Sequence, residues 1–146
     1  MTYTMVVKSS NNLTTNELFE SVELITNTFG LEKMSKDDKL MLKQVNTIWF
    51  MVKLNDEIVG VATLYDKKED NLKNITITKS HRQKGLCKWI LTSVRNFYNA
   101  NNKAVQSPTL TVKRMEKSTI CLVDMYIKHG YQIYKIDDDY YFLKLI

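Results

Sequence analysis

The segment from Ile75 to Ala100 joins a β-branched run, a basic turn and an amphipathic helix, and it constrains the fold of the whole chain. Isoleucine and threonine alternate at 75–78, which predicts a strand. The segment after Gly85 predicts a helix, because its apolar residues recur at helical spacing: Leu86, Trp89, Ile90, Val94 and Phe97. We expect this apolar face to be buried. The turn at 82–85 therefore leads from a strand into the start of a helix.

This turn, Arg82-Gln83-Lys84-Gly85, has the features of an anion-binding site. The start of a helix presents N–H groups that lack intrahelical partners and carries partial positive charge. Phosphate groups bind readily at such a position, and glycine lets a ligand approach the backbone closely. The turn contains neither GxxxxGK[ST] nor GxGxxG, so it is neither a P-loop nor a dinucleotide-binding fingerprint.

The positive charge of the chain is concentrated around the same turn. The formal net charge is +5. Residues 71–115 contain nine Lys and Arg and no Asp or Glu, whereas the remainder has 12 basic and 16 acidic residues, a net charge of −4. We expect a polyanionic ligand on the basic segment and a cationic one near the acidic remainder. The alternative is a basic face that is simply solvated.

Length and composition predict one domain, residues 1–146, of an ordinary globular protein with 44% hydrophobic and 25% charged residues. No apolar run is long enough to span a membrane, and the first residues lack the pattern of a signal peptide. Only two cysteines are present, Cys87 and Cys121, which favours a reducing compartment and a cytoplasmic location. The cysteines and histidines lack zinc-ligand spacing, so we predict no metal.

The remaining elements follow from apolar periodicity and turn residues. Asn55-Asp56-Glu57 predicts a turn between two strands, and Gly60 within the second strand suggests a bulge or a close neighbour. The predicted order is β-α-α-β-β-β-α-β-α-β-β. Further strands are expected at 3–7, 47–54, 58–65, 109–112, 131–136 and 140–145. Further helices are expected from a cap at Thr14 or Thr15 through Asn27, from 35 onward and at 117–129.

This order and three local patterns resemble the GCN5-related N-acetyltransferase (GNAT) family over the whole chain. The turn Arg82-x-x-Gly85-x-Cys87 is similar to the family's pyrophosphate motif, Gln/Arg-x-x-Gly-x-Gly/Ala, with Cys87 as a departure. Residues 55–62, NDEIVGVA, resemble the family's turn and glycine-bearing strand, and residues 125–131, MYIKHGY, its Leu-Tyr-x-x-x-Gly-Phe signature. The resemblance implies an α/β (α+β) fold, a single GNAT-like domain. Its central sheet would be mixed and mostly antiparallel, with helices on both faces and a splayed parallel strand pair that holds CoA.

The resemblance also implies acetyl-CoA as co-substrate and direct transfer of its acetyl group to a primary amine in a ternary complex. The splayed strands would begin near Asn71 and Thr109, with the pantetheine arm between them and the pyrophosphate against the turn. Register from the family signature places Thr119 where the family often has an asparagine beside CoA. The implied cofactor-binding residues are Ile75, Ile77, Thr78, Lys79, Arg82, Gln83, Lys84, Gly85, Leu86, Cys87, Lys88 and Thr119.

The resemblance gives Tyr126 the role of the acid that protonates the departing thiolate. The alternative is a tyrosine packed at the edge of the core. No carboxylate lies on the strands at 72–78 and 109–112, so the general base is unassigned. Asn71 or Thr111 could position a water, and the remaining candidates each resemble a solvated turn charge: Asp70, Glu116 and Asp137 to Asp139.

The acidic remainder favours a cationic acceptor: a polyamine, an amino sugar, or a peptide lysine or N-terminus. The residues predicted to bind it are Phe29, Asp137, Asp138 and Asp139. Because no base is evident, a non-catalytic, CoA-binding regulatory GNAT-like domain is the alternative function. A basic nucleic-acid-binding module is a second alternative, although the chain lacks a recognition motif. A homodimer is possible, and we expect no membrane partner.

Overall fold

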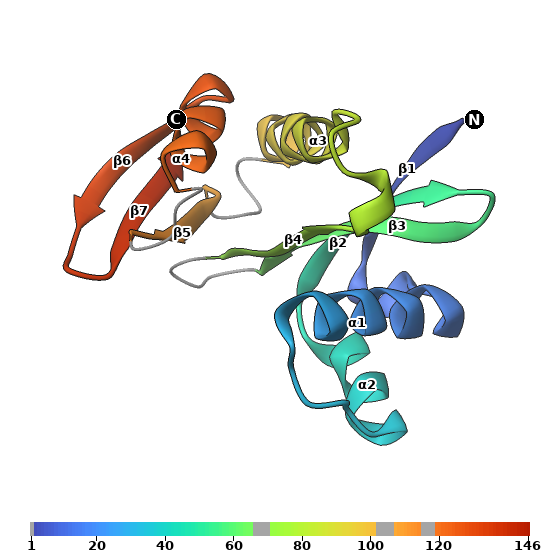
Figure 1. Cartoon of the computed structure of the whole chain (residues 1–146). Coiled ribbons are helices and arrows are strands. Elements are labelled where there is room, and N and C mark those ends of the chain that lie inside the picture. The colour runs from blue at the N-terminus through green and yellow to red at the C-terminus, as the bar shows by residue number, and fades with distance from the viewer. Residues whose placement is uncertain (1, 66–70, 102–106, 115–118) are drawn as a thin grey trace.

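The computed structural model describes residues 2–65, 71–101, 107–114 and 119–146, without the side chains of 119–121 (Figure 1). Its strands are β1 (Tyr3–Ser9), β2 (Thr47–Leu54), β3 (Glu57–Tyr65), β4 (Leu72–Ile77), β5 (Thr109–Lys113), β6 (Tyr131–Ile136) and β7 (Tyr140–Leu145). Its helices are α1 (Thr15–Phe29), α2 (Lys36–Met41), α3 (Leu86–Asn101) and α4 (Thr119–Lys128), with short 3₁₀ turns η1 (Ser10–Asn12), η2 (Leu42–Gln44) and η3 (Lys79–His81).

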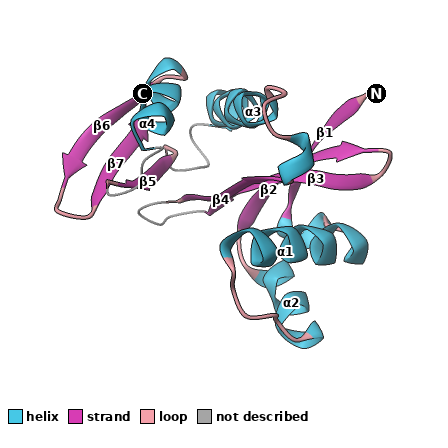
Figure 2. Cartoon of the chain, viewed as in Figure 1, coloured by secondary structure: helices cyan, strands magenta, loops and turns pink. Residues whose placement is uncertain are grey.

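The described strands form two antiparallel sheets, one ordered β1-β2-β3-β4 and the other β5-β7-β6. Figure 2 shows α3 on one side of the four-stranded sheet and α1 with α2 on the other, while α4 lies against the three-stranded sheet. The predicted order of elements and the α/β fold class are confirmed. Most predicted bounds lie within about two residues of the observed ones, because strong local periodicity determined them.

The apolar run of β2 is buried on both faces, because successive side chains of a strand point to opposite sides. Phe50 and Val52 pack in the layer beneath α3, whereas Trp49 and Met51 pack in the layer beneath α1. The prediction for α3 was wrong at one position, because Trp89 is 36% exposed. Gly60 has the predicted close neighbour, since a Cβ there would lie 2.7 Å from the Ile77 side chain of β4.

The two sheets meet at one buried asparagine. Asn71, immediately before β4, is fully buried, and its Oδ1 accepts hydrogen bonds from the backbone N–H (2.6 Å) and the hydroxyl (3.2 Å) of Thr109, the first residue of β5. Its Nδ2 donates to the carbonyl of Ser107 at 3.2 Å. Both strands start at this junction and run away from it without pairing as a ladder. The expected splayed pair is therefore formed by β4 and β5.

A β-bulge changes the direction of β4 just beyond the junction. Val61 pairs with Thr76 and Thr63 with Lys73, so Ala62 alone stands opposite two residues, Asn74 and Ile75. Asn74 has a left-handed φ of 60°, a conformation that asparagine tolerates better than most residues. Its amide donates to the Thr63 hydroxyl at 3.0 Å and stabilises the bulge. The bulge removes two residues of β4 from the regular pairing with β3.

Helix α1 is fixed to the four-stranded sheet by Glu17, whose side chain is 4% exposed. Its carboxylate contacts the ammonium groups of Lys8 on β1 (2.8 Å) and Lys53 on β2 (2.9 Å). It also accepts the backbone N–H of Thr14, whose hydroxyl caps the helix by accepting from Glu17 N–H. Of the two predicted caps, Thr14 and Thr15, this capping box identifies Thr14 as the N-cap, and α1 begins at Thr15. These interactions fix the first turn of α1 against β1 and β2.

Replacing Asn71 with leucine should destabilise the fold, because the buried N–H of Thr109 and carbonyl of Ser107 would lose their partner. Such buried unsatisfied groups cost about 1–3 kcal/mol each, so we expect a loss of about 3 kcal/mol. The melting temperature should fall by roughly 10 °C. Asn99→Leu, at an exposed position on α3, is the matched control. Equal melting temperatures for the two variants would show that the junction contributes little.

The Glu17 contacts predict a pH-dependent stability. Hydrogen bonds from Lys8, Thr14 and Lys53 outweigh desolvation and lower the pKa of this carboxyl to about 2. A lowered pKa contributes stability above the unfolded value of 4.5, and that contribution is lost as pH falls toward 2. Glu17→Gln should therefore lower stability by about 2 kcal/mol at pH 7 and much less at pH 2.5. Denaturant unfolding at both pH values tests this, with the exposed Glu23→Gln as the control.

Candidate active site

Two adjoining cavities lie along the splayed strands β4 and β5. The strand cavity, of about 490 Å³, lies between the first residues of β4 and β5 and is lined by Phe29, Leu31, Leu72, Lys73, Asn74, Ile75, Leu110, Thr111 and Tyr126. The turn cavity, of about 410 Å³, extends from the second half of β4 to the start of α3 and to α4. Phe29 and Ile75 line both cavities, so the two spaces are neighbours.

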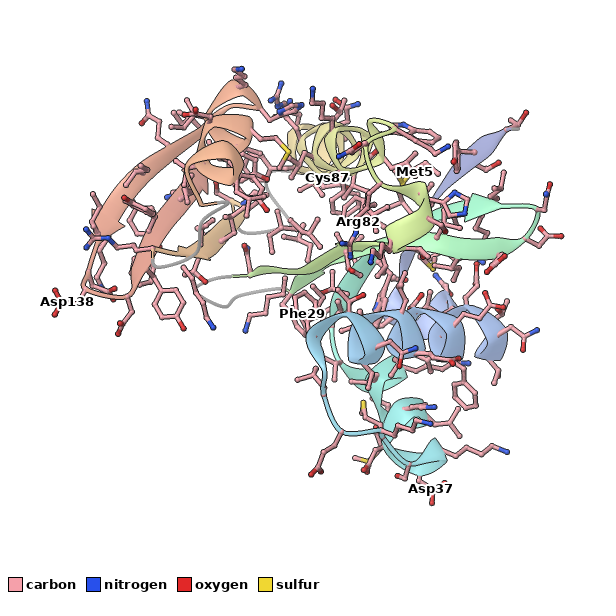
Figure 3. The ribbon with its side chains drawn as sticks, viewed as in Figure 1. Met5, Phe29, Asp37, Arg82, Cys87 and Asp138 are labelled. Atoms are coloured by element: carbon pink, nitrogen blue, oxygen red, sulfur yellow. The ribbon has the colours of Figure 1, made fainter. Side chains whose placement is uncertain are left out.

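The turn cavity brings together most of the predicted cofactor-binding residues: Ile75, Ile77, Arg82, Gln83, Gly85, Leu86, Cys87 and Lys88. The sequence analysis missed the wall that α4 contributes through Leu122 and Met125. Figure 3 shows Phe29 at the end of α1, Arg82 in the turn near β4 and Cys87 at the start of α3. A basic turn, an apolar strand and an apolar helix face therefore surround one elongated space.

The backbone of the turn is shaped by its own residues. The Nε of Arg82 donates to the Ile77 carbonyl at 3.0 Å, which ties the turn to the end of β4. Gln83 and Gly85 both have left-handed φ values, 61° and 78°. A Cβ added at Gly85 would meet no heavy atom within 4 Å, so open space lies beside this residue. The turn thus presents accessible backbone and two cationic side chains, Arg82 and Lys88, at the start of α3.

Three predicted cofactor-binding residues, Thr78, Lys79 and Lys84, lie outside the lining of both cavities. Thr78 donates its N–H to the Val59 carbonyl of β3 at 2.8 Å, so this N–H is already engaged in a hydrogen bond within the protein. Lys79 and Lys84 are exposed close to the turn. Thr119 is the first residue of α4, and its side chain is outside the described part of the chain. These residues stay predictions, with Lys79 and Lys84 placed to add positive charge around the turn cavity.

Tyr126 lies on α4 with its side chain only 8% exposed, and it lines the strand cavity. Its ring contacts that of Tyr131 edge-on, with 5.8 Å between centroids. Arg95 of α3 donates to the carbonyl of His129 and so ties the end of α4 to α3. Gly130 adopts a φ of 93° beside this arginine, where a larger residue would be strained. The position of Tyr126 is therefore fixed by the helix rather than by a loop.

Burial governs the ionisation of the groups around Tyr126. Desolvation raises the pKa of the Tyr126 phenol well above its usual range, and the nearby Cys87 thiol adds to the shift. Burial likewise raises the pKa of Cys87 and of Tyr131. At neutral pH all three groups hold their protons. Tyr126 can therefore donate a proton or a hydrogen bond, but it cannot act as a base.

The predicted acidic acceptor site is separate from the cavities. The Asp137 carboxylate accepts the N–H groups of Asp139 (2.9 Å) and Tyr140 (2.7 Å), and these bonds lower its pKa. Figure 3 shows Asp138 at the tip of the β6–β7 hairpin, away from Phe29 and Cys87. None of the three aspartates lines either cavity. Phe29 does line them, so the structure brings only this one predicted acceptor residue to the strand cavity.

Among the described residues that line the strand cavity, only Lys73 and Tyr126 have an ionisable side chain. The base candidates Asp70 and Glu116 lie outside the described residues. Asn71 is engaged at the strand junction, whereas Thr111 lines the cavity. The described part of the chain contains no group of three or more His, Cys, Asp or Glu that could hold a metal ion. None of its helices is both long and apolar enough to cross a bilayer.

Solved structures with the same fold cover nearly the whole chain. An acyl-CoA N-acyltransferase from Pseudomonas aeruginosa superposes with a TM-score of 0.73 at 17% identity, covering 99% of this chain and 100% of that one. A PaiA N-acetyltransferase from Thermoplasma acidophilum, in complex with coenzyme A, gives 0.69 at 13% identity, with 97% and 98% covered. A GNAT acetyltransferase from Elizabethkingia anophelis with acetyl-CoA bound gives 0.62 at 15% identity, with 98% and 97% covered.

The family assignment comes from the sequence itself. A search of curated protein sequences finds no significant match. The family profile described as "Acetyltransferase (GNAT) domain" matches residues 13–140, from just before α1 to the first residue of β7. This match covers both splayed strands, the basic turn and the helix that carries Tyr126. The chain therefore belongs to the GNAT family of acyl-CoA-dependent N-acyltransferases.

Proposed function

We propose that this protein transfers the acetyl group of acetyl-CoA to a primary amine, by direct attack of the amine within a ternary complex. The observation that carries the proposal is that the two cavities are neighbours and share Phe29 and Ile75. One space ends at a basic helix start, suited to a pyrophosphate, and the other holds Tyr126. The bound coenzymes in the Thermoplasma and Elizabethkingia structures support this assignment.

The described residues fit the three parts of the coenzyme. Backbone from Arg82 to Lys88, with open space beside Gly85, would hold the pyrophosphate. The apolar wall formed by Ile75, Ile77 and Met125 suits the pantetheine arm. Exposed Lys79 and Lys84 would face the remaining phosphate by charge. The thioester supplies an activated acyl group, and the chain supplies its orientation.

Transfer of the acetyl group requires that the amine nitrogen attack the carbonyl carbon as a neutral nucleophile. The carbon–sulfur bond then breaks, its electron pair stays on sulfur, and the sulfur takes up a proton. The nitrogen, positively charged after the attack, releases one proton to solvent, and the group that protonated the sulfur regains a proton from solvent. Tyr126 is held at the strand cavity with its proton retained, and we assign it that donation. Burial disfavours a free thiolate as well as a phenolate, so the two proton affinities rise together.

Two alternatives remain distinguishable by experiment. A regulatory CoA-binding domain would bind acetyl-CoA without releasing thiol in the presence of any amine. A nucleic-acid-binding module would gain thermal stability from oligonucleotides rather than from acetyl-CoA. Thermal-shift measurements with both ligands, followed by thiol-release assays over a panel of amines, separate the three functions. Amine-dependent thiol release with acetylated product supports transfer, and its absence across the panel contradicts it.

Gly85→Asp should weaken acetyl-CoA binding at least about tenfold, because it places negative charge beside the pyrophosphate. Gly85→Ala is the matched control, since it introduces the same backbone strain at φ 78° without the charge. We therefore expect a larger affinity loss for the aspartate variant than for the alanine variant. The dissociation constants, together with melting temperatures without ligand, test this. Full thermal stabilisation of Gly85→Asp by acetyl-CoA would place the pyrophosphate elsewhere.

Tyr126→Phe should lower turnover by roughly 100-fold while leaving acetyl-CoA affinity nearly unchanged, because only a transition-state contact is lost. Tyr131→Phe is the matched control: its hydroxyl is buried and has no hydrogen-bond partner among the described residues. Removing that hydroxyl should leave turnover within about twofold and raise stability slightly. Turnover of Tyr126→Phe within about twofold of the parent would remove Tyr126 from the mechanism.

A further inference from the structure

One side-chain hydrogen bond joins the segment before the basic turn to the first strand of the sheet. The Tyr3 hydroxyl of β1 and Nδ1 of His81, the last residue of η3, lie 2.9 Å apart, although 78 residues separate them in the sequence. The two rings also meet edge-on, with 5.8 Å between their centroids. Because β1 and β4 are the outermost strands of the four-stranded sheet, this contact brings the segment that follows β4 to the opposite edge of the sheet.

His81 connects this contact to the coenzyme side of the molecule. It lines the turn cavity and directly precedes Arg82, whose Nε donates to the carbonyl of Ile77 at the end of β4. In the described part of the chain, the bond to Tyr3 is the only side-chain hydrogen bond that links residues 79–85 to a strand other than β4. A change in this bond therefore acts directly on the segment that leads into the turn.

The turn needs support from its surroundings because its backbone is exposed and partly left-handed. Residues 82–85 are all exposed, and Gln83 has a φ of 61°, which is unfavourable for a residue with a side chain. Such a conformation persists where the neighbouring structure fixes it. A phosphate gains most from N–H groups that are already aligned, since ordering them during binding costs affinity. Contacts that fix the turn beforehand should therefore strengthen coenzyme binding.

Building on the proposed function, we propose that Tyr3 and His81 are positioning residues for the coenzyme. Their hydrogen bond holds the segment that leads into the turn and so fixes the turn backbone in the conformation that receives the pyrophosphate. Neither side chain lines the strand cavity with Tyr126, so the pair acts on binding of acetyl-CoA and leaves the transfer step unchanged. Coenzyme affinity thus depends on the first strand of the chain.

The competing interpretation is that the pair only stabilises the fold. Tyr3 is half-buried and packs against the hydrophobic core beneath α3, so its ring contributes to stability whatever its hydroxyl does. The test therefore removes the hydrogen bond and keeps the ring, and it measures coenzyme binding and stability separately.

Tyr3→Phe should raise the dissociation constant for acetyl-CoA, measured by calorimetry, about fivefold, the change expected from one hydrogen bond of ordinary strength. His81→Phe should raise it by a similar factor, and the double variant by no more than either single one, because both substitutions break the same bond. His81→Asn can offer an amide group near the position of Nδ1 and should restore most of the affinity. The matched control is Tyr98→Phe, at a half-buried position on α3 outside the lining of both cavities, which should bind like the parent.

A donor without a pyrophosphate separates positioning of the turn from a general structural effect. S-acetylpantetheine carries the same thioester and arm but lacks the pyrophosphate and the nucleotide. With an amine that the parent acetylates, Tyr3→Phe should raise KM for acetyl-CoA about fivefold at unchanged kcat. Its kcat/KM for S-acetylpantetheine should stay within about twofold of the parent value. A general structural defect would instead lower kcat/KM for both donors by the same factor.

Melting temperatures without ligand are measured for every variant, and His81→Phe leaves β1 unchanged, so it tests the inference even where a change on β1 disturbs the fold. Equal acetyl-CoA affinity for the parent, Tyr3→Phe and His81→Phe would overturn the inference and leave the proposed function intact. An equal loss with both donors, or fully additive losses in the double variant, would also overturn it. A parent protein that binds no acetyl-CoA would overturn the proposed function and the inference together.

Discussion

The hydrogen bonds of Asn71 are the constraint on which the site depends. Strands that pair as a regular ladder lie about 4.8 Å apart, which leaves no room for a ligand between them. Here the Asn71 side chain, instead of backbone pairing, forms the hydrogen bonds to Ser107 and Thr109 at the start of β5. The strands β4 and β5 therefore contact each other at one end only. The Asn74 bulge then removes the next part of β4 from its regular pairing with β3. Two asparagines thus hold open a space that two fully paired sheets would close.

The turn cavity and the strand cavity are shaped by different parts of the residues that line them. The turn cavity relies on backbone, with the shape of the turn set by left-handed Gln83 and Gly85 and by the Arg82 bond to Ile77. The strand cavity relies on side chains, whose positions depend on helices docked elsewhere. Glu17 anchors α1 and hence Phe29, and Arg95 anchors α4 and hence Tyr126. A change far from the cavities can therefore alter the strand cavity while it leaves the turn intact.

Sequence reasoning succeeded where the determining interaction is local. The periodicity of α3, the threonine cap of α1 and the glycine of the turn are all encoded within a few residues. The family signature placed Tyr126 on a helix that ends near Gly130, and the structure has it on α4, whereas its role stays a prediction. It failed where partners are distant. Nothing near Asn71 reveals that its amide will meet Thr109, 38 residues away. The aspartates at 137–139 illustrate a related limit, because overall charge suggested ligand binding and gave no sign that Asp137 caps its own hairpin turn.

Burial determines which form of Tyr126 and Cys87 is present beside the cavities, because it raises the pKa of both groups. Desolvation favours the neutral form of every titratable group, so it raises the pKa of a phenol or a thiol. Tyr126 therefore keeps its proton at neutral pH, on a helix whose end Arg95 ties to α3. The strand cavity beside it is lined by polar as well as apolar side chains, among them Lys73, Asn74 and Thr111. The polar groups of this cavity thus come from the two splayed strands, so the junction that separates the strands also determines which groups lie near Tyr126.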